Sequence, residues 1–97
     1  MLNTLEIAEL VRLSTPKQSK YAASKVLGIT PQRVDNWYHR GQVMSDEIAL
    51  KAASELELPH EYVLACLQAE RTNGKPSHGF WVKIAEKLTP QESGNDD

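Results

Sequence analysis

Residues 28–41, GITPQRVDNWYHRG, contain the signals that start, orient and end one short helix. Thr30 can cap a helix with its side chain, and the following Pro31 suits the first helical turn. Val34 and Trp37 are three residues apart and therefore share one helical face. We expect a helix from about 31 to 39 that buries this face and turns its polar residues outward: Gln32, Arg33, Asp35, Asn36, His39 and Arg40.

A second helix is predicted directly before this one. Thr15, Pro16 and Gln18 have the spacing of a capping box, so we expect the helix to begin near 16 and to run to 27. Gly28 can adopt the left-handed backbone conformation that ends a helix. Only a tight connection around Gly28 then joins the two helices, and this makes them cross steeply.

The rest of the chain also has helical periodicity, and we find no strand-like alternation. The fold class is therefore expected to be all-α, a compact domain of five to six helices. Further helices are predicted at 3–14, 45–56, 59–71 and 80–88. The chain divides into a main domain (1–71), a loop with a C-terminal helix (72–90) and an acidic tail predicted to be disordered (91–97).

The composition is typical of a soluble chain with one core. The 97 residues are 40% apolar and 25% charged, and no apolar run approaches the roughly 18 residues of a membrane span. The N-terminal MLNTLEIAELVRL lacks the basic start and apolar stretch of a secretory signal. Because the single cysteine, Cys66, has no internal partner for a disulfide, we expect a reducing, cytoplasmic setting.

The net charge is −2, but the charge is unevenly distributed. Residues 1–44 contain six basic and three acidic residues, whereas residues 45–97 contain five basic and ten acidic residues. A basic first half is compatible with nucleic-acid binding, against which the net charge alone would argue. The alternative interpretation is that a small domain shows such an imbalance by chance.

Residues 21–37, YAASKVLGITPQRVDNW, resemble the helix-turn-helix of Cro/C1-type (XRE-like) DNA-binding domains. The resemblance depends on Ala23 and Ser24, on the turn at 27–29, and on Val34 and Trp37. It covers residues 17–58, of which WYHRGQVMSDEIALKAASELEL is similar to the YdaS-like branch. The later YVLACLQAER and FWVKIAEKL resemble small helix-turn-helix proteins of bacteriophages more loosely. Ser24 departs from the alanine most common at its position, but it is small enough to preserve the crossing.

The resemblance implies a lambda-repressor-like fold and a sequence-specific DNA-binding transcriptional regulator, a phage- or prophage-encoded repressor that is often a homodimer. The helix at 31–39 would then lie in the major groove of double-stranded DNA. There Gln32 can pair with adenine, Arg33 with guanine, and Asn36 with adenine or a phosphate. The residues expected at the DNA backbone are Lys17, Gln18, Ser19, Lys20, Thr30, Tyr38, His39 and Arg40.

Three of the residues in or near this helix have competing interpretations. Trp37 is expected in the core rather than as a stacking platform for single strands. Tyr38 is expected to be partly buried, with its hydroxyl free to reach a phosphate. Asp35 can accept a hydrogen bond from cytosine, or it can hold Arg33 or His39 in place, and both roles stay open.

The sequence lacks the patterns typical of catalysis or metal binding. The three histidines are scattered over different segments and form no zinc-site spacing with the one cysteine. Asp46 and Glu47 are explained by capping of a helix N-terminus, and Cys66 is expected to be a buried, unreactive thiol. We therefore expect no enzyme activity, no metal and no cofactor.

Two large aromatic residues, Phe80 and Trp81, follow the loop TNGKPSHG (72–79) and either fold back onto the core or face a partner. Because one small helix-turn-helix binds weakly, we expect a homodimer through the helices at 59–71 and 80–88. A second hypothesis makes the chain a protein-interaction module with the same fold, such as an anti-repressor or an inhibitor of a host protein. The negative net charge favours this hypothesis, whereas the basic residues at 17–40 favour DNA. The expected interface residues are Phe80, Trp81, Ile84 and Leu88.

Overall fold

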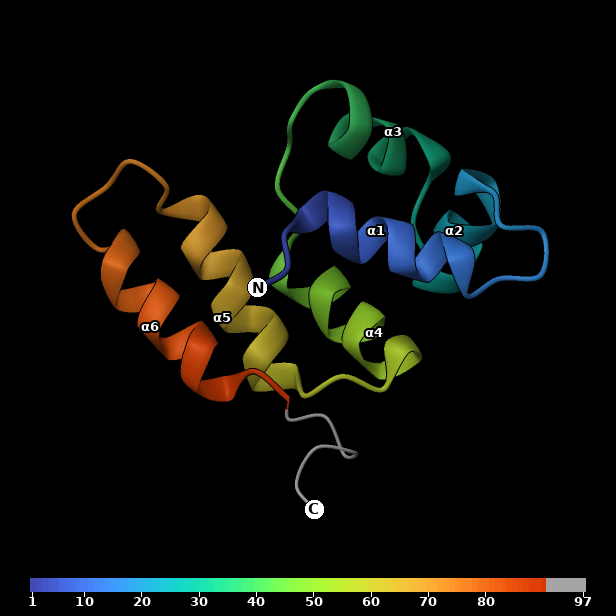
Figure 1. Cartoon of the computed structure of the whole chain (residues 1–97). Helices are drawn as coiled ribbons and strands as arrows, with labels where there is room; N and C mark the ends of the chain where they lie inside the picture. The colour runs from blue at the N-terminus through green and yellow to red at the C-terminus, as the bar shows by residue number, and fades with distance from the viewer. Residues whose placement is uncertain (91–97) are drawn as a thin grey trace, which may run out of the picture.

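The computed structural model describes residues 1–90, and within them every regular element is an α-helix (Figure 1). This confirms the predicted all-α class. None of these helices has the length and apolar character needed to cross a membrane. The tail at 91–97, predicted to be disordered, lies outside the described residues. The helices are α1 (Thr4–Leu13), α2 (Lys20–Leu27), α3 (Pro31–His39), α4 (Asp46–Leu56), α5 (His60–Arg71) and α6 (His78–Leu88).

The start of α2 differs from the prediction. The Thr15 side chain accepts the Gln18 backbone N–H at 3.0 Å, as the capping-box spacing requires. Gln18, however, has a φ of 52°, a left-handed conformation that interrupts a helix. The helix therefore begins after this turn, with Ser19 as its N-cap accepting the Ala22 N–H at 3.0 Å. The predicted start near residue 16 is wrong because the signal there forms an isolated turn.

The start of α6 also differs, since the helix begins at His78 rather than at Phe80. The His78 ring nitrogen Nδ1 lies 2.8 Å from the carbonyl oxygen of Ala69, near the end of α5. This contact between side chain and backbone connects the first turn of α6 to α5. The predicted bounds of α3 are confirmed, and Thr30 caps it by accepting the Arg33 N–H at 3.2 Å.

One apolar core joins the helices, and α1 lies at its centre because it packs against α2, α3 and α4. Burying one aliphatic side chain of this kind contributes about 1.5–3 kcal/mol. This core is therefore the main force that orients the short helices α2 and α3. Its largest fully buried side chains include Ile7, Val11, Leu27, Val34, Met44, Val63 and Leu67.

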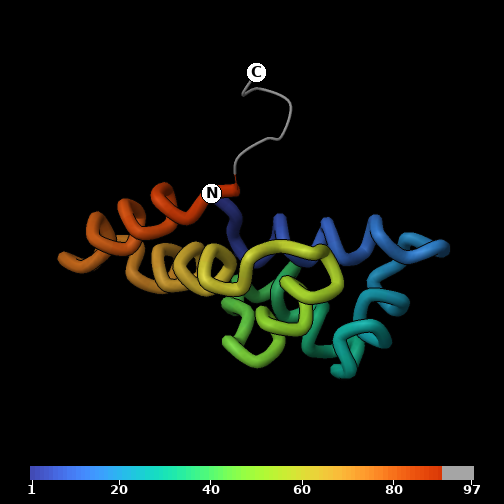
Figure 2. The backbone as a smooth tube through the Cα atoms, turned by 90° about the horizontal axis from the view of Figure 1, so that it is seen from below, coloured from blue at the N-terminus to red at the C-terminus, as the bar shows by residue number. Residues whose placement is uncertain are grey.

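The molecule is a flat slab of 38 × 35 × 18 Å with two parts. Helices α1 to α4 form one part, and α5 and α6 form an antiparallel hairpin beside it (Figure 1). Figure 2 shows α1 and α6 along one broad side of the slab, with α2, α3 and α4 toward the other. Helix α5 packs against both α4 and α6, and Cys66 on α5 is buried as predicted.

A buried hydroxyl connects the two parts. The Thr4 side chain donates to the Glu70 carboxylate at 2.8 Å and accepts the Met44 backbone N–H at 3.0 Å. Arg71 donates to the Met44 carbonyl at 2.7 Å and pairs with Asp46 at 2.8 Å. The end of α5 is therefore attached both to the start of α1 and to the segment that follows α3.

Candidate nucleic-acid interface

The connection between α2 and α3 depends on a glycine. Gly28 has a φ of 70°, which L side chains rarely adopt, and the Ile29 N–H donates to the Ser24 carbonyl at 3.0 Å. Lys51 from α4 donates to the Leu27 carbonyl at 3.4 Å. A Cβ on Gly28 would lie 3.1 Å from the Lys51 Nζ, so a larger residue would also disturb this contact. The predicted left-handed helix end is confirmed.

Helix α3 is oriented by the two apolar residues that the sequence identified. Val34 and Trp37 are buried, and Trp37 retains only 4% of its accessible surface. Trp37 is therefore a core residue, and the alternative of an exposed stacking platform is wrong. Helix α3 packs against α2 and α1 on this face, which directs its opposite face to solvent.

The three residues predicted to contact bases lie together on the outer side of α3. Gln32 and Arg33 are exposed, and Asn36 is half-buried. The Gln32 side-chain amide donates to the Asn36 side-chain oxygen at 3.2 Å, across one turn. The side chains therefore present amide and guanidinium groups at one place, which is the chemistry that base edges in a major groove require.

Asp35 is half-buried on the same helix. The described residues include no ion pair between Asp35 and either Arg33 or His39. Its carboxylate therefore does not hold these side chains in place in the structure.

Most of the residues predicted to contact the DNA backbone lie around the first turns of α2 and α3. Ser19 and Thr30 are the N-caps of these helices, where backbone N–H groups and the helix dipole favour an anion. Lys17 and Gln18 are exposed on the turn before α2. His39 and Arg40 are exposed at the other end of α3.

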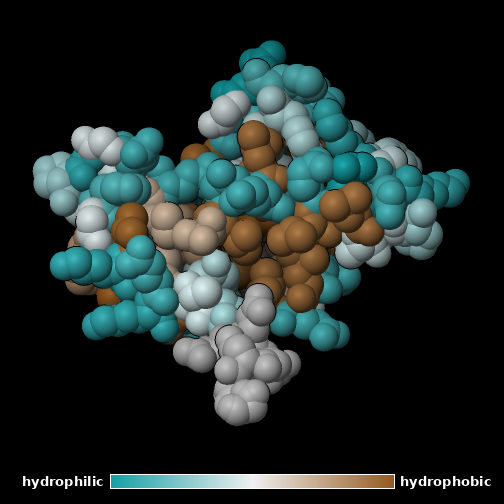
Figure 3. Space-filling view, in the orientation of Figure 1, coloured by the Kyte–Doolittle hydropathy of each residue, from teal (hydrophilic) through white to brown (hydrophobic). Residues whose placement is uncertain are grey.

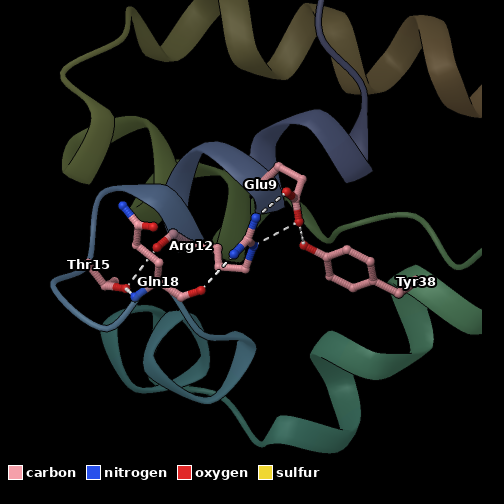
Figure 4. A network of polar contacts seen from close by, with 5 residues as sticks. All are labelled: Glu9, Arg12, Thr15, Gln18 and Tyr38. Atoms are coloured by element: carbon pink, nitrogen blue, oxygen red, sulfur yellow. Dashed lines mark hydrogen bonds and ion pairs between the residues drawn. The ribbon is translucent and has the colours of Figure 1, made fainter.

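The Tyr38 hydroxyl, expected from the sequence to be free for a phosphate, is bonded within the protein. It donates to Glu9 of α1 at 2.5 Å, so the prediction of a free hydroxyl is wrong (Figure 4). The Lys20 ammonium lies 4.2 Å from the centre of the Tyr38 ring, within cation–π range. Tyr38 therefore contacts both α1 and the start of α2, and it positions α3 between them.

Glu9 also binds Arg12, one turn further along α1. The Arg12 guanidinium donates to both carboxylate oxygens of Glu9, at 3.0 and 2.7 Å. Arg12 donates further to the backbone carbonyl of Gln18 at 2.6 Å, on the turn that precedes α2 (Figure 4). One network thus connects α1 with α3 and with the turn before α2. We call Glu9, Arg12 and Tyr38 the clamp.

The clamp shifts the pKa values of its members. Hydrogen bonds from Arg12 and Tyr38 lower the pKa of Glu9 to about 2. Burial, together with the bond to Glu9, raises the pKa of Tyr38 to about 12. The carboxylate of Glu9 also raises the pKa of Arg12. The clamp is therefore in its fully bonded form over a wide range of pH around neutrality.

Glu9 and Arg12 were not among the functional residues predicted from the sequence. Their opposite charges at a spacing of three residues were visible, and such a pair is usually a solvated surface contact of small energetic value. The bond from Glu9 to Tyr38 spans 29 residues of sequence. No local pattern encodes this distant contact.

The predicted interface residues near the C-terminus divide into two groups. Phe80 and Leu88 are exposed, whereas Trp81 and Ile84 are half-buried. Ile84 packs against the core, so only part of its side chain is open to a partner. The rings of Phe80 and Trp81 meet edge to face, with centroids 5.1 Å apart.

Across residues 1–90, no group of three or more His, Cys, Asp or Glu side chains is arranged to hold a metal ion. No protein-family model matches the chain, and comparisons with curated proteins and with solved structures likewise find no match.

Proposed function

We propose that this chain is a sequence-specific DNA-binding protein, a transcriptional repressor of phage or prophage origin, in which α2 and α3 act as a helix-turn-helix. The observation that carries the proposal is the division of α3 into two faces. Trp37 and Val34 are buried, while Gln32 and Arg33 are exposed beside Asn36. A short helix with this division can enter a major groove without disturbing the core behind it.

The side chains on the outer face have distinct roles in this proposal. Arg33 pairs with the O6 and N7 atoms of guanine, and Gln32 and Asn36 pair with adenine edges. Lys17, Lys20 and Arg40 neutralise phosphates and determine the register of the protein on the duplex. The resulting binding is specific in sequence and sensitive to salt.

The clamp gives this proposal a physical basis for rigid recognition. Base contacts require that α3 keep one orientation, because a side chain displaced by a fraction of an ångström loses its bidentate geometry. Tyr38 attaches the end of α3 to α1 through Glu9, and Lys20 covers the Tyr38 ring. Tyr38 is accordingly a positioning residue in this proposal and is removed from the set of backbone contacts.

Fluorescence anisotropy with the DNA that flanks the gene for this chain tests the proposal, because small regulators commonly act on their own promoter region. Scrambled DNA of equal length is the control, and both are measured over a salt series. We expect tight binding to one fragment, with the logarithm of the affinity falling steeply against the logarithm of salt concentration. Absence of binding to either DNA at low salt would count against the proposal.

A second candidate function is a protein-interaction module, for example an anti-repressor. The observation that favours it is the exposed Phe80, which retains 59% of its accessible surface beside the half-buried Trp81. If this function is the correct one, Phe80→Ala abolishes activity in the cell while Arg33→Ala leaves it unchanged. The DNA-binding proposal predicts a loss for Arg33→Ala.

A further inference from the structure

Helix α1 has an apolar surface that no other part of residues 1–90 covers. Its inner face buries Ile7 and Val11, but its outer face still exposes Leu5, Leu10 and Leu13. Figure 3 shows apolar surface gathered over the middle of the broad face that α1 crosses. A groove of about 390 Å³ lies on this side of α1 and is lined by Leu2, Leu5, Glu6, Glu9 and Leu10. We call this the α1 groove.

The outer face of helix α6 complements the α1 groove, because it combines an aromatic side chain with two lysines. Phe80, Lys83 and Lys87 are exposed and follow the spacing of three and four residues that places side chains on one helical face. Ala85 is the one fully buried residue of this helix. Neither lysine forms an ion pair within the described residues. The face is therefore apolar at one end and positively charged along its length.

The charges of the two surfaces are opposite. The α1 groove contains two carboxylates, those of Glu6 and Glu9. Arg12 already compensates Glu9, whereas no cation of the described residues pairs with Glu6. Glu6 therefore supplies most of the attraction for a lysine. A partner helix that combines an aromatic side chain with lysines one turn apart fits this groove, and α6 is such a helix.

Helices α1 and α6 lie on the same broad side of the slab, which limits how two copies can meet. Helices α1 and α6 run along one side of the molecule in Figure 2, and in Figure 1 α5 lies between them. Two copies that meet through this side, related by a twofold axis in its plane, can place α6 of each copy against α1 of the other. Such a contact is self-complementary and closes as a dimer.

We propose that the chain forms a twofold homodimer in which α6 of each copy packs in the α1 groove of the other. Phe80 enters the groove between leucine side chains, and Lys83 and Lys87 face Glu6. Helix α3 lies at the upper edge of the molecule in Figure 1, so an axis running toward that edge leaves both α3 helices at the same edge of the dimer. The two copies would then present both α3 helices to one DNA duplex, although the dimer itself does not depend on DNA binding.

Sedimentation equilibrium of the full chain, without DNA, tests the proposal. We expect a monomer–dimer equilibrium in the micromolar range, weakened about tenfold or more by Phe80→Ala or Leu5→Ala. Two matched controls are Tyr21→Ala, which removes an aromatic side chain with the same 59% exposure on α2, and Leu50→Ala, which removes a leucine exposed at 37% on α4 against 42% for Leu5. Circular dichroism checks that each variant is folded.

Mixing two variants distinguishes this dimer from others. Leu5→Asp disables the groove and Phe80→Asp disables the helix, so each variant alone should be monomeric. In the mixture, one of the two reciprocal contacts is intact, and we expect dimers of one variant with the other. A wild-type monomer at high micromolar concentration would overturn the proposal. So would a dimer that only Phe80 variants weaken and that mixing does not restore, because that result indicates α6 against α6.

Discussion

Helices α2 and α3 form one helix pair and α5 and α6 form another, but the second helix is held very differently in the two pairs. Helix α3 buries Val34 and Trp37 in the core and is attached to α1 through Tyr38. Helix α6 has one fully buried residue, Ala85, and rests mainly on α5. The first pair holds a polar face in a fixed orientation, and the second presents an apolar and basic face at the edge of the molecule.

This difference suits two kinds of recognition. Hydrogen bonds to base edges need fixed geometry, because they weaken steeply when angles and distances change. A hydrophobic contact is not directional and tolerates small adjustments of the helix that makes it. The firmly held pair, α2 and α3, is therefore the one for which polar contacts are proposed. The less embedded pair, α5 and α6, is the one for which an apolar contact is proposed.

The largest expected effect separates the two tryptophans. Trp37→Ala should lower the free energy of unfolding by about 3–5 kcal/mol, because it removes a buried ring from the core. Trp81→Ala should cost about 1–2 kcal/mol, because this ring is half-buried on one neighbouring helix. Urea unfolding followed by far-ultraviolet circular dichroism measures both values. Equal losses would contradict the distinction between the two pairs.

The comparison also shows which features a sequence can predict. The bounds of α3, its buried face and the left-handed Gly28 all followed from residues within one or two turns of each other. The start of α2 did not, because Thr15 and Gln18 form the same hydrogen bond in a turn as in a helix. The positive φ of Gln18 excludes the helix in favour of the turn. The local sequence rarely predicts that conformation for a residue other than glycine.

The candidate site could be predicted from the sequence to about the same extent as the fold. The outward position of Gln32, Arg33 and Asn36 followed from helical periodicity. The role of Tyr38 depended on Glu9, 29 residues away, and the covering of its ring depended on Lys20 in another helix. Long-range contacts of this kind require the packing of three helices to be known first.

On DNA, substitutions in α3 and in the turn before α2 should have two distinct effects on binding. Arg33→Ala should lose about 1–3 kcal/mol of discrimination at one base pair, because a bidentate contact to guanine is removed. Lys17→Ala should weaken binding to all sequences alike and reduce the salt slope by about 1. Lys17 is the better probe of phosphate contacts, since Lys20 also supports the Tyr38 ring. Anisotropy titrations over a salt series separate the two, and identical signatures would refute the assigned roles.

Two glycines allow the connections of the two pairs to be compared. Gly28→Ala and Gly74→Ala each place a side chain at positive φ, 70° and 83°, which costs about 1–2 kcal/mol of stability. Only Gly28 has a neighbour in the way, the Lys51 Nζ at 3.1 Å. We therefore expect Gly28→Ala to be the more destabilising variant and also to weaken DNA binding. Gly74→Ala, in open space between α5 and α6, should leave DNA binding unchanged.

The smallest expected effect concerns the clamp and its dependence on pH. Because the pKa of Glu9 is lowered from 4.5 to about 2, its stabilising contribution is present above pH 4.5 and is lost as the pH falls from there toward 2. The pKa of Tyr38 is raised from 10.0 to about 12, so its contribution is present below pH 10 and is lost as the pH rises toward 12. Glu9→Gln should flatten the acid limb of the stability profile, and Tyr38→Phe should flatten the alkaline limb.

At neutral pH, Tyr38→Phe should cost about 0.5–1.5 kcal/mol, the usual net value of one hydrogen bond. Tyr21→Phe is the matched control, because the Tyr21 ring is exposed on α2 and does not contact Glu9. The same variant separates positioning from contact on DNA. Tyr38→Phe should lower the affinity for the specific fragment more than for scrambled DNA, since a less firmly held α3 loses base contacts but keeps its phosphate contacts. An equal loss of affinity on both DNAs would instead indicate that the Tyr38 hydroxyl contacts the DNA backbone and that the core alone orients α3.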